Sequence, residues 1–459
     1  MELQKVIIEN FKCFQSKTEI EFGKLTLLTG ANSSGKSSII YSILGAIQSG
    51  EFPFQFSTNG KYVNMGDFNE IVFGHDKNNI VKLGYVFKNS IVYQIDTEWK
   101  ENSTNKLPKL HKLSAVSEYF KLKIEYKNRK YIIDFKYEPK EDPQNQIVSK
   151  DFYEKFLSNM ADLFDNINTS KSESKNETQN DKDFSKIMNE MLQAQDIKGL
   201  AVSDLSFGKE MLKQPGGIKL RQIFDVIEKL FKSYDERINF ISSFRLHPDR
   251  VYLETSKADL KIYNDGKGYL DQIVSWENKN PKKHNELLGI LKELDLIYDI
   301  KTKRTDGGKY DILIKPKENS IFTSLYDVGF GISQFLPIIV ADLQLPKTST
   351  LYVAQPEIHL HPSVQSSFGN YLINQITKND KRYVIETHSE YLLNKIRLAI
   401  VKGEIQQNDV KVIFLENLSD ETKVYEIEFN NKGQIVNAPN NFFETYMLDV
   451  MNIAINAVE

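Results

Sequence analysis

Short runs rich in Val, Ile, Leu and Thr open the chain and predict strands at residues 3–8, 18–22 and 24–29. The third run leads directly into GANSSGKSS and then into SIIYSILGAIQ, an apolar stretch with helical character. From about residue 80 to residue 137, apolar and polar positions alternate in runs such as IVKLGYVF and KYIIDF. The first part of the chain is therefore predicted as strand, loop and helix, followed by an antiparallel β lobe.

The middle of the chain differs in composition. Residues 166–182 have almost no apolar content and predict a mobile loop inside an insertion. Residues 183–235 are predicted to be helical, with PGG at 215–217 as an interruption. A strand with a polar exit, INFISSFRLHPDR, follows at 238–250, and residues 256–308 form a second polar and helical region that ends in a TDGG turn.

Apolar density returns from residue 309. The apolar runs LYVAQ and KRYVIET predict strands, and they alternate with predicted helices at 363–377 and 389–403, the second ended by Gly403. Strands and helices at this spacing are typical of a sheet covered by helices, which is an α/β core. The closing segment, residues 442–458, has the pattern of an amphipathic helix that could cap the core or dock a partner.

Composition sets limits on the class of protein. Of the 459 residues, 40% are hydrophobic and 26% charged, which is enough for a sizeable core and excludes global disorder. The 59 basic and 62 acidic residues give a formal charge of −3, which excludes a histone-like attraction of the whole chain to nucleic acid. Cys13 is the only cysteine, so neither an intrachain disulfide nor a cysteine-based zinc site can form.

The chain carries no pattern for a membrane segment. The longest strongly apolar stretch, from Gly329 to Ala341, is about 13 residues long and too short to span a bilayer. The N-terminus is charged too early and too often for a signal peptide. We therefore expect a soluble, cytoplasmic protein with no membrane partner.

The segment Gly30–Ser37 reads GANSSGKS and matches G-x-x-x-x-G-K-[ST] at every fixed position. Between a strand and a helix, the glycines of this pattern let backbone N–H groups surround the phosphates of a nucleotide at the positive end of the helix dipole. Lys36 would reach the β- and γ-phosphates, and the hydroxyl of Ser37 would bind Mg²⁺. The sequence predicts a nucleotide site here.

A second group of motifs lies roughly 300 residues later. Asp327–Gln334 reads DVGFGISQ, a Gly-rich turn whose free N–H groups and Ser333 hydroxyl suit a γ-phosphate, although a tight helix-entry turn is the alternative. The strands in LYVAQPEIHLHP and RYVIETHSEYLL end near a carboxylate and a histidine. Both ends are therefore predicted at the carboxyl edge of a sheet, where α/β proteins bind ligands.

Taken together, NFKCF, GANSSGKSS, DVGFGISQ, QPEIHLHP and ETHSEYLL resemble the motifs of SMC/RecF/ABC-type ATPases in order and spacing. The chain is most similar to the prokaryotic overcoming-lysogenisation-defect-like group, which includes anti-phage defence ATPases such as those of Septu and PARIS. The resemblance covers about residues 1–90 and 236–420. It implies an α/β fold, an ABC-type (P-loop NTPase) head with an antiparallel β lobe and a helical insertion. The implied divisions are the first half of the head with the β lobe (1–140), a helical, partly disordered insertion (141–235), the second half of the head (236–420) and a C-terminal strand and helix (421–459).

The resemblance also implies roles for residues. The Walker A contacts to ATP would be Gly30, Asn32, Ser33, Ser34, Gly35, Lys36, Ser37 and Ser38, with Mg²⁺ on Ser37. Gly331, Ser333 and Gln334 would form the signature motif, and His388 would be the switch histidine that senses the γ-phosphate. Because such heads hold ATP between Walker A of one subunit and the signature of the other, a homodimer or higher homo-oligomer is implied. Many members of the group are encoded beside nucleases, so a separately encoded nuclease is the implied effector.

The chain departs from this group at the end of the Walker B strand. Where members commonly read Asp-Glu-Pro-Glu, this chain reads Ala354-Gln355-Pro356-Glu357. Ala354 cannot hold Mg²⁺, and the amide of Gln355 can orient a water but cannot accept its proton. Glu357 is the only carboxylate left in the motif. Since proton abstraction contributes only ~10²–10⁴-fold, we expect slow ATP hydrolysis with Glu357 as base. The alternatives are an ATP-bound scaffold that does not hydrolyse and a RecF-like DNA-repair ATPase.

Four further features are singled out, and three of them have two interpretations each. His359 and His361, with His388 and Glu357, could form a metal site, or they belong to a loop that faces the dimer partner. Arg245 could reach a phosphate, but a structural salt bridge is favoured. Phe11-Lys12 would lie beside the adenine. The Lys-rich run at 109–140 could bind nucleic acid, but the solvated face of an edge sheet is favoured.

Overall fold

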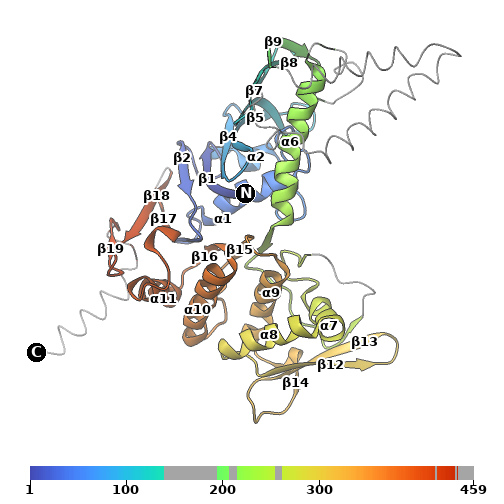
Figure 1. Ribbon diagram of the computed structural model, residues 1–459, viewed down its shortest axis with the longest axis vertical. Coiled ribbons are helices and arrows are strands. Elements are labelled where there is room, and N and C mark those ends of the chain that lie inside the picture. Colours follow the sequence, from blue (N-terminus) through green and yellow to red (C-terminus); the bar gives the residue numbers. More distant parts are fainter. Residues whose placement is uncertain are drawn as a thin grey trace, which may run out of the picture.

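Three β-sheets and the helices packed on them make up the described part of the molecule in the computed structural model (Figure 1). The structure describes residues 1–138, 194–205, 214, 216–253, 261–418, 421–439 and 442. The predicted loop at 166–182 and all but the first residue of the predicted helix at 442–458 lie outside this part of the chain. None of the described helices is long and apolar enough to cross a membrane.

An eight-stranded antiparallel sheet contains most of the N-terminal strands. In spatial order its strands are β2 (Thr18–Glu21), β1 (Glu2–Glu9), β4 (Val81–Lys88), β5 (Val92–Glu101), β6 (Pro108–Ser117), β7 (Phe120–Lys127), β8 (Lys130–Tyr137) and β9 (Gln195–Val202). The antiparallel β lobe predicted from the alternation at 80–137 is confirmed.

Strand β9 corrects the prediction of helix across residues 183–235. Its partly buried Ile197, Leu200 and Val202 pack against the core of the sheet, and it pairs antiparallel with β8. The free edge of β8 decides its conformation, because strand formation depends on cross-strand packing more than on intrinsic preference. The helical part begins later, at α6 (Gly217–Glu236), which runs beside this sheet (Figure 1).

A seven-stranded sheet joins the two ends of the chain. In spatial order its strands are β10 (Ile238–Ile241), β15 (Thr350–Ala354), β16 (Arg382–Glu386), β3 (Leu25–Gly30), β17 (Val410–Asn417), β18 (Thr422–Phe429) and β19 (Ile435–Val436). The first five are parallel, and β18 and β19 are antiparallel. The carboxyl ends of β15, β16 and β3 therefore meet at one edge, with β16 in the middle.

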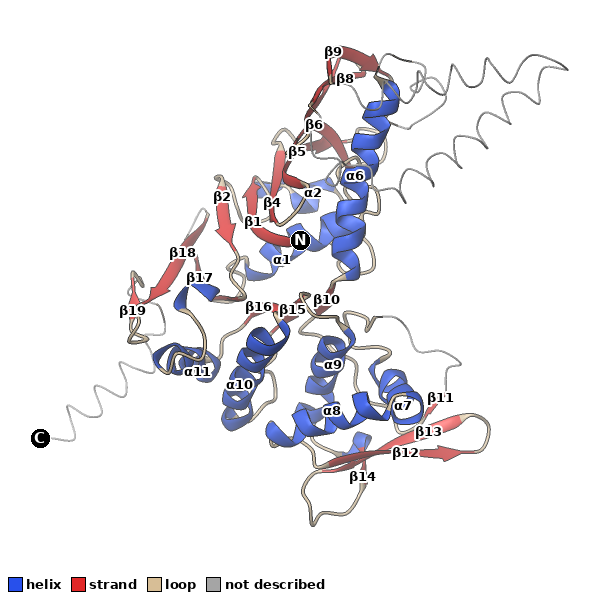
Figure 2. Cartoon of the chain, in the orientation of Figure 1, coloured by secondary structure: helices blue, strands red, loops and turns tan. Residues whose placement is uncertain are grey.

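Both faces of this sheet are buried, as its apolar runs predict. In β15, Leu351 and Val353 join the core on one face, whereas Tyr352 and Ala354 join the core on the other. Helix α1 (Lys36–Gln48) contacts both β1 and β3 and so lies between the two large sheets. Figure 2 shows the opposite face covered by three helices, α9 (Phe330–Gln344), α10 (Pro362–Asn379) and α11 (Glu390–Val401). The predicted helices at 363–377 and 389–403 are confirmed.

A smaller region packs on α9, far from the eight-stranded sheet (Figure 1). It consists of α7 (Tyr269–Lys279), α8 (Pro281–Glu293), and a sheet of β11 (Tyr252–Leu253), β13 (Lys309–Lys315), β12 (Asp299–Thr305) and β14 (Thr323–Ser324). The predicted TDGG turn joins β12 to β13, with Gly307 and Gly308 at φ +78° and +69°. The remaining short elements are α2 (Phe68–Ile71), η1 (Phe73–His75), η2 (Leu325–Asp327) and η3 (Gln407–Asp409).

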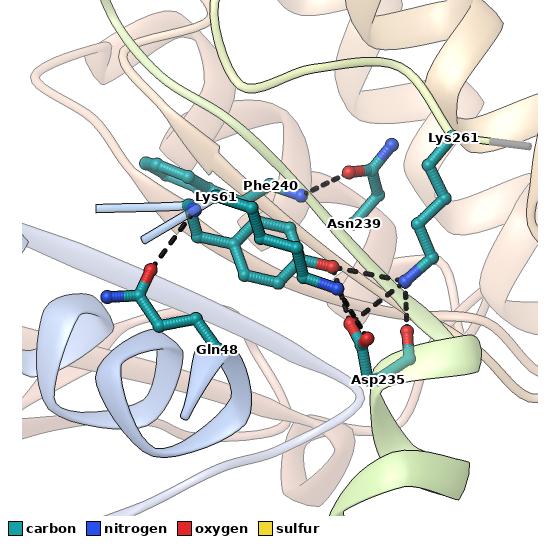
Figure 3. Close-up of polar contacts among 7 residues, drawn as sticks. Gln48, Lys61, Asp235, Asn239, Phe240 and Lys261 are labelled. Atoms are coloured by element: carbon teal, nitrogen blue, oxygen red, sulfur yellow. Dashed lines mark hydrogen bonds and ion pairs between the residues drawn. The ribbon is translucent and has the colours of Figure 1, made fainter. Parts of the chain in front are cut away.

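Asp235, at the end of α6, connects three segments that are distant in sequence (Figure 3). Its carboxylate accepts hydrogen bonds from Tyr62 Oη at 2.6 Å and from Lys261 Nζ at 3.0 Å, and it also pairs with Lys61. Burial alone would raise the pKa of Asp235, but the hydrogen bonds from Lys61 and Tyr62 outweigh it and lower the pKa. The cluster fixes α6 relative to the loop that follows α1.

Candidate nucleotide-binding site

The loop between β3 and α1 has the conformation that its glycines allow. Gly30 has φ +133°, and a Cβ there would lie 2.0 Å from Leu415 O. Gly35 has φ +97°, and a Cβ would lie 2.3 Å from Cys13 Sγ. Side chains are therefore excluded at both positions by space and by backbone conformation. The strand, loop and helix predicted for the nucleotide motif are confirmed.

Lys36 folds back onto this loop. Its Nζ donates to Gly30 O at 3.0 Å and to Ala31 O at 2.7 Å, and the residue is 3% exposed. Burial lowers the pKa of Lys36, and the charges of Glu386 and Glu357 oppose that change. An anion that entered the loop would offer Lys36 a stronger partner than two carbonyl groups.

A cavity of about 380 Å³ opens over the loop. It is lined by Lys12, Cys13, Ser33, Ser34, Gly35, Lys36, Ser37, Ser38, Glu70, Val72, Gly74, His75 and Glu386. The hydroxyl of Ser34 is buried and has no hydrogen-bond partner in the described structure. Six predicted Walker A residues, from Ser33 to Ser38, line this cavity, whereas the predicted contacts Gly30 and Asn32 are not among its lining residues. Lys12 lies on its wall, whereas Phe11, predicted beside the adenine with it, is fully buried in the core.

Glu386, at the end of β16, belongs to the site but to none of the predicted motif residues. It lines the cavity, is only 6% exposed, and its Oε2 accepts a hydrogen bond of 2.8 Å from Ser37 Oγ. Burial raises the pKa of Glu386, and the Ser37 hydrogen bond and the charge of Lys36 oppose the rise. The available signal was a carboxylate at the end of a buried strand, two positions before the predicted switch histidine His388.

The turn after β15 contains Gln355 and Glu357, the residues predicted from the altered Walker B motif. Gln355 has φ +47°, a conformation uncommon for residues other than glycine, and its N–H donates to Glu386 O at 2.7 Å. Arg245 Nη2 donates to Ala354 O at 2.6 Å and to Gln355 O at 3.2 Å. The salt bridge favoured for Arg245 is therefore corrected, within the described residues, to hydrogen bonds with the backbone of this turn, and its predicted phosphate contact stays a prediction. Burial lowers the pKa of Arg245 to about 10.

Glu357 and His388 meet across the ends of β15 and β16. The backbone N–H of His388 donates to Glu357 Oε1 at 2.6 Å, and Glu357 Oε2 is buried with no hydrogen-bond partner in the described part of the chain. Burial raises the pKa of Glu357, although the His388 N–H and other donors oppose the rise. Partial loss of solvation and the charge of Lys36 lower the pKa of His388. Glu357 therefore has one oxygen oriented by a backbone donor and a second that is buried, and it is not among the residues that line the cavity over the loop.

The predicted signature residues are held within the subunit. A Cβ at Gly331 would lie 2.4 Å from His359 O, so this turn packs tightly on the loop after β15. Ser333 Oγ donates to Phe330 O at 3.0 Å, and Gln334 Nε2 donates to Leu246 O at 3.3 Å. The contacts that Gly331, Ser333 and Gln334 are predicted to make with the nucleotide of a second subunit stay a prediction.

The histidines of QPEIHLHP are separated by their local roles. His361 caps α10, where its Nδ1 accepts from Ser363 N at 3.3 Å and lies 2.8 Å from Ser363 Oγ. His359 is exposed, with φ +65°. No group of three or more His, Cys, Asp or Glu side chains is placed to hold a metal ion within the residues described.

Comparison with known proteins identifies the family. A model of the AAA ATPase domain family matches residues 1–393. Three solved structures are similar at low identity. They are the SMC head domain from Thermotoga maritima (11% identity, TM-score 0.38, covering 93% of this chain and 100% of that one), the Smc head domain with an extended coiled coil bound to the C-terminal domain of ScpA from Pyrococcus furiosus (10%, 0.40, 100% and 100%), and the SmcHead bound to the C-winged helix domain of ScpA (10%, 0.41, 93% and 98%). No curated protein matches the chain. The family match spans the nucleotide loop and the ends of β15 and β16, and the chain belongs to the AAA ATPase domain family.

Proposed function

We propose that the protein is a slow ATPase that dimerises around ATP and acts as a nucleotide-gated switch for a separately encoded nuclease in anti-phage defence. Glu357 is the base in this proposal. The observation that carries it is the carboxylate held at Oε1 by His388 N–H at 2.6 Å, with Oε2 buried and unpartnered among the described residues.

ATP with Mg²⁺ fits the residues of the cavity. The loop admits no side chain at Gly35, and the buried Ser34 hydroxyl lacks a partner in the described structure. The hydroxyl of Ser37 donates a hydrogen bond to the carboxylate of Glu386. Mg²⁺, when bound, neutralises charge on the β- and γ-phosphates. The loop N–H groups and Lys36 bind the phosphates, for which Lys36 exchanges Gly30 O and Ala31 O for phosphate oxygens.

Glu357 would take the proton of the attacking water on Oε2 as the water oxygen bonds to the γ-phosphorus and the bond to the β-phosphate oxygen breaks. Its raised pKa favours this role, because a general base works best with a pKa closer to the pH of the reaction. Gln355 would orient the water as a hydrogen-bond acceptor. The imidazole of His388, which follows the end of β16, would donate to the γ-phosphate.

A second candidate is a scaffold that binds ATP and does not hydrolyse it. The observation in its favour is Ala354, which leaves the end of β15 without a carboxylate. Both candidates require ATP binding, so binding alone does not separate them.

Steady-state phosphate release separates them. The measurement uses the full chain, with Lys36→Ala as the variant that cannot bind phosphate and Glu357→Gln as the variant that keeps shape and loses the base. Release above the Lys36→Ala level that Glu357→Gln lowers by about 10²–10⁴-fold supports the ATPase. Release at the Lys36→Ala level in the unmodified protein leaves only the scaffold, provided that equilibrium dialysis detects bound ATP.

The assembly and the defence role rest on the motif resemblance and need their own tests. Mass photometry with and without ATP measures whether nucleotide drives dimerisation. Plaque counts on cells that carry the gene with its neighbours, compared with the same cells carrying Lys36→Ala, test defence. Protection that survives Lys36→Ala would contradict a nucleotide-gated switch, and ATPase stimulation by DNA ends would point instead to repair.

A further inference from the structure

We propose that Glu386 is the magnesium carboxylate of this site, supplied by β16 in place of the one that β15 lacks. This inference rests on the proposed ATP-binding function. It assigns a role to a residue outside the Walker A, signature and Walker B motifs.

The register of the central sheet puts Glu386 at the level of the missing carboxylate. β15 and β16 are parallel, and Ala354 is paired with Glu386. Paired residues in adjacent strands point to the same face of a sheet and lie about 5 Å apart. Ala354 faces the core that contains α1, so Glu386 projects toward the same side, where the nucleotide loop lies.

The strand order brings this carboxylate closer to the loop. β16 lies between β15 and β3, and Glu386 is paired with Leu28 near the end of β3. A carboxylate on β16 is therefore one strand nearer to the nucleotide loop than a carboxylate on β15 would be. Relocation to the neighbouring strand moves the charge toward the phosphates and keeps it at the same sheet edge.

The contact between Glu386 and Ser37 points to Mg²⁺ as the ion that both side chains would bind. Ser37 supplies the hydroxyl that the loop motif assigns to Mg²⁺, and its Oγ lies 2.8 Å from Glu386 Oε2. A carboxylate and a hydroxyl, completed by phosphate oxygens and water, are the oxygen ligands that Mg²⁺ prefers. Burying a carboxylate is unfavourable unless charge or hydrogen bonds compensate, and a divalent cation beside Glu386 would do so.

The alternative role for Glu386 is structural, as an acceptor that fixes Ser37 to β16. Glu386→Gln separates the two roles, because an amide oxygen still accepts from Ser37 but carries no charge. Glu390→Gln, four positions later on α11, is the matched control for losing a carboxylate outside the cavity. Glu386→Asp keeps the charge and serves as the second variant if the amide variant does not fold.

The experiment measures Mn²⁺ bound in the complex with ATP by electron paramagnetic resonance, together with ATP affinity in EDTA and in Mg²⁺. We expect Glu386→Gln to weaken metal binding in the ATP complex by about 10- to 100-fold, the loss typical when a group supporting a metal site is removed. ATP affinity in EDTA should not fall, because repulsion of the phosphates by the carboxylate is removed. Glu390→Gln should match the unmodified protein.

The most stringent test of the proposal returns the carboxylate to β15. Ala354→Asp, combined with Glu386→Gln, should restore metal affinity, because it places an acid at the paired position. Metal affinity in Glu386→Gln equal to that of the unmodified protein would overturn the proposal, as would a loss that Ala354→Asp does not restore. If the unmodified protein binds no ATP in either condition, the proposed function itself fails, and that outcome is distinct from a selective loss of metal.

Discussion

Replacement of Asp342 with asparagine is expected to destabilise the protein more than any single surface charge would. Asp342 lies in α9 and is 1% exposed. Its Oδ2 accepts a hydrogen bond from Tyr383 Oη at 3.0 Å and a second from Tyr371 Oη, and Lys381 Nζ lies 3.0 Å from Oδ1. The carboxylate thus ties the helix of the predicted signature to α10 and to the start of β16.

The expected loss of stability follows from the buried positive charge that the asparagine variant would leave without a partner. Lys381 is 4% exposed, and its ammonium would lose the only formal negative charge that the structure places within ion-pair distance of it in the described residues. Removal of one partner of a buried ion pair costs about 3–5 kcal/mol, because the other charge stays buried and uncompensated. The amide oxygen still accepts from one tyrosine. Tyr371→Phe or Tyr383→Phe removes one hydrogen bond and should cost about 1 kcal/mol.

Urea denaturation followed by tryptophan fluorescence measures this cost. Trp99 reports on the eight-stranded sheet, and Trp276, in α7, reports on the region that packs on α9. The control is Asp295→Asn, since Asp295 and its partner Lys317 are 74% and 66% exposed and such a pair contributes at most about 1 kcal/mol.

The double variant Asp342→Asn with Lys381→Met should recover most of the lost stability, because it removes the buried ammonium of Lys381 that Asp342→Asn leaves without a partner. The reasoning would be refuted if Asp342→Asn shifted the transition no further than Asp295→Asn. It would also be refuted if the double variant were less stable than Asp342→Asn alone.

Three other predictions concern the site and the junction of the segments. Gly331→Ala should cost about 1–3 kcal/mol, because its Cβ would lie 2.4 Å from His359 O, whereas Gly329→Ala, with nothing within 4 Å, should be nearly neutral in the same thermal melts; equal melting shifts would contradict this. The pH profile of ATP hydrolysis should have its acid limb above the ordinary glutamate value of about 4.3, because burial raises the pKa of Glu357 and the base works only when deprotonated, so the rate falls as the pH falls through that raised pKa. A limb at or below the ordinary value would exclude Glu357 as the base. Asp235→Asn should lower stability at pH 7 by about 1–2 kcal/mol, and the difference from the unmodified protein should shrink below about pH 4, because a lowered folded-state pKa contributes stability above the unfolded value that is lost as the pH falls through the folded one. A difference that does not depend on pH would show that the charge of Asp235 is not responsible.

Strong periodicity explains why most elements were predictable. The alternation at 80–137 and the buried runs of β3, β15 and β16 predict strands. The same patterns also predict which faces of these strands are buried. Residues 195–202 carry a weak pattern, and their conformation depends on the free edge of β8, which no local signal encodes.

The residues of the candidate site also include some that were predictable from the sequence and others that were not. The conformation of the loop between β3 and α1 was predictable because its glycines, Lys36 and Ser37 lie within one short segment. The salt bridge favoured for Arg245 was wrong because its partners, the carbonyl groups of Ala354 and Gln355, belong to a strand end more than a hundred residues away, and backbone acceptors have no sequence signature. An arginine before a proline turn gives no information about which of phosphate, carboxylate or carbonyl it will meet.

Glu386 shows a more general reason why sequence motifs can miss a site residue. A motif is defined along one strand, but a metal site forms across the ends of several strands at one sheet edge. Ala354 and Glu386 are paired residues on neighbouring strands, so a carboxylate lost from one can be supplied by the other with the same face and level preserved. Only the spatial order β15, β16, β3 makes the exchange possible, because it places β16 beside the nucleotide loop. The loss of a Walker B acid in the sequence is therefore no evidence against metal binding until the acids on the adjacent strand have been counted.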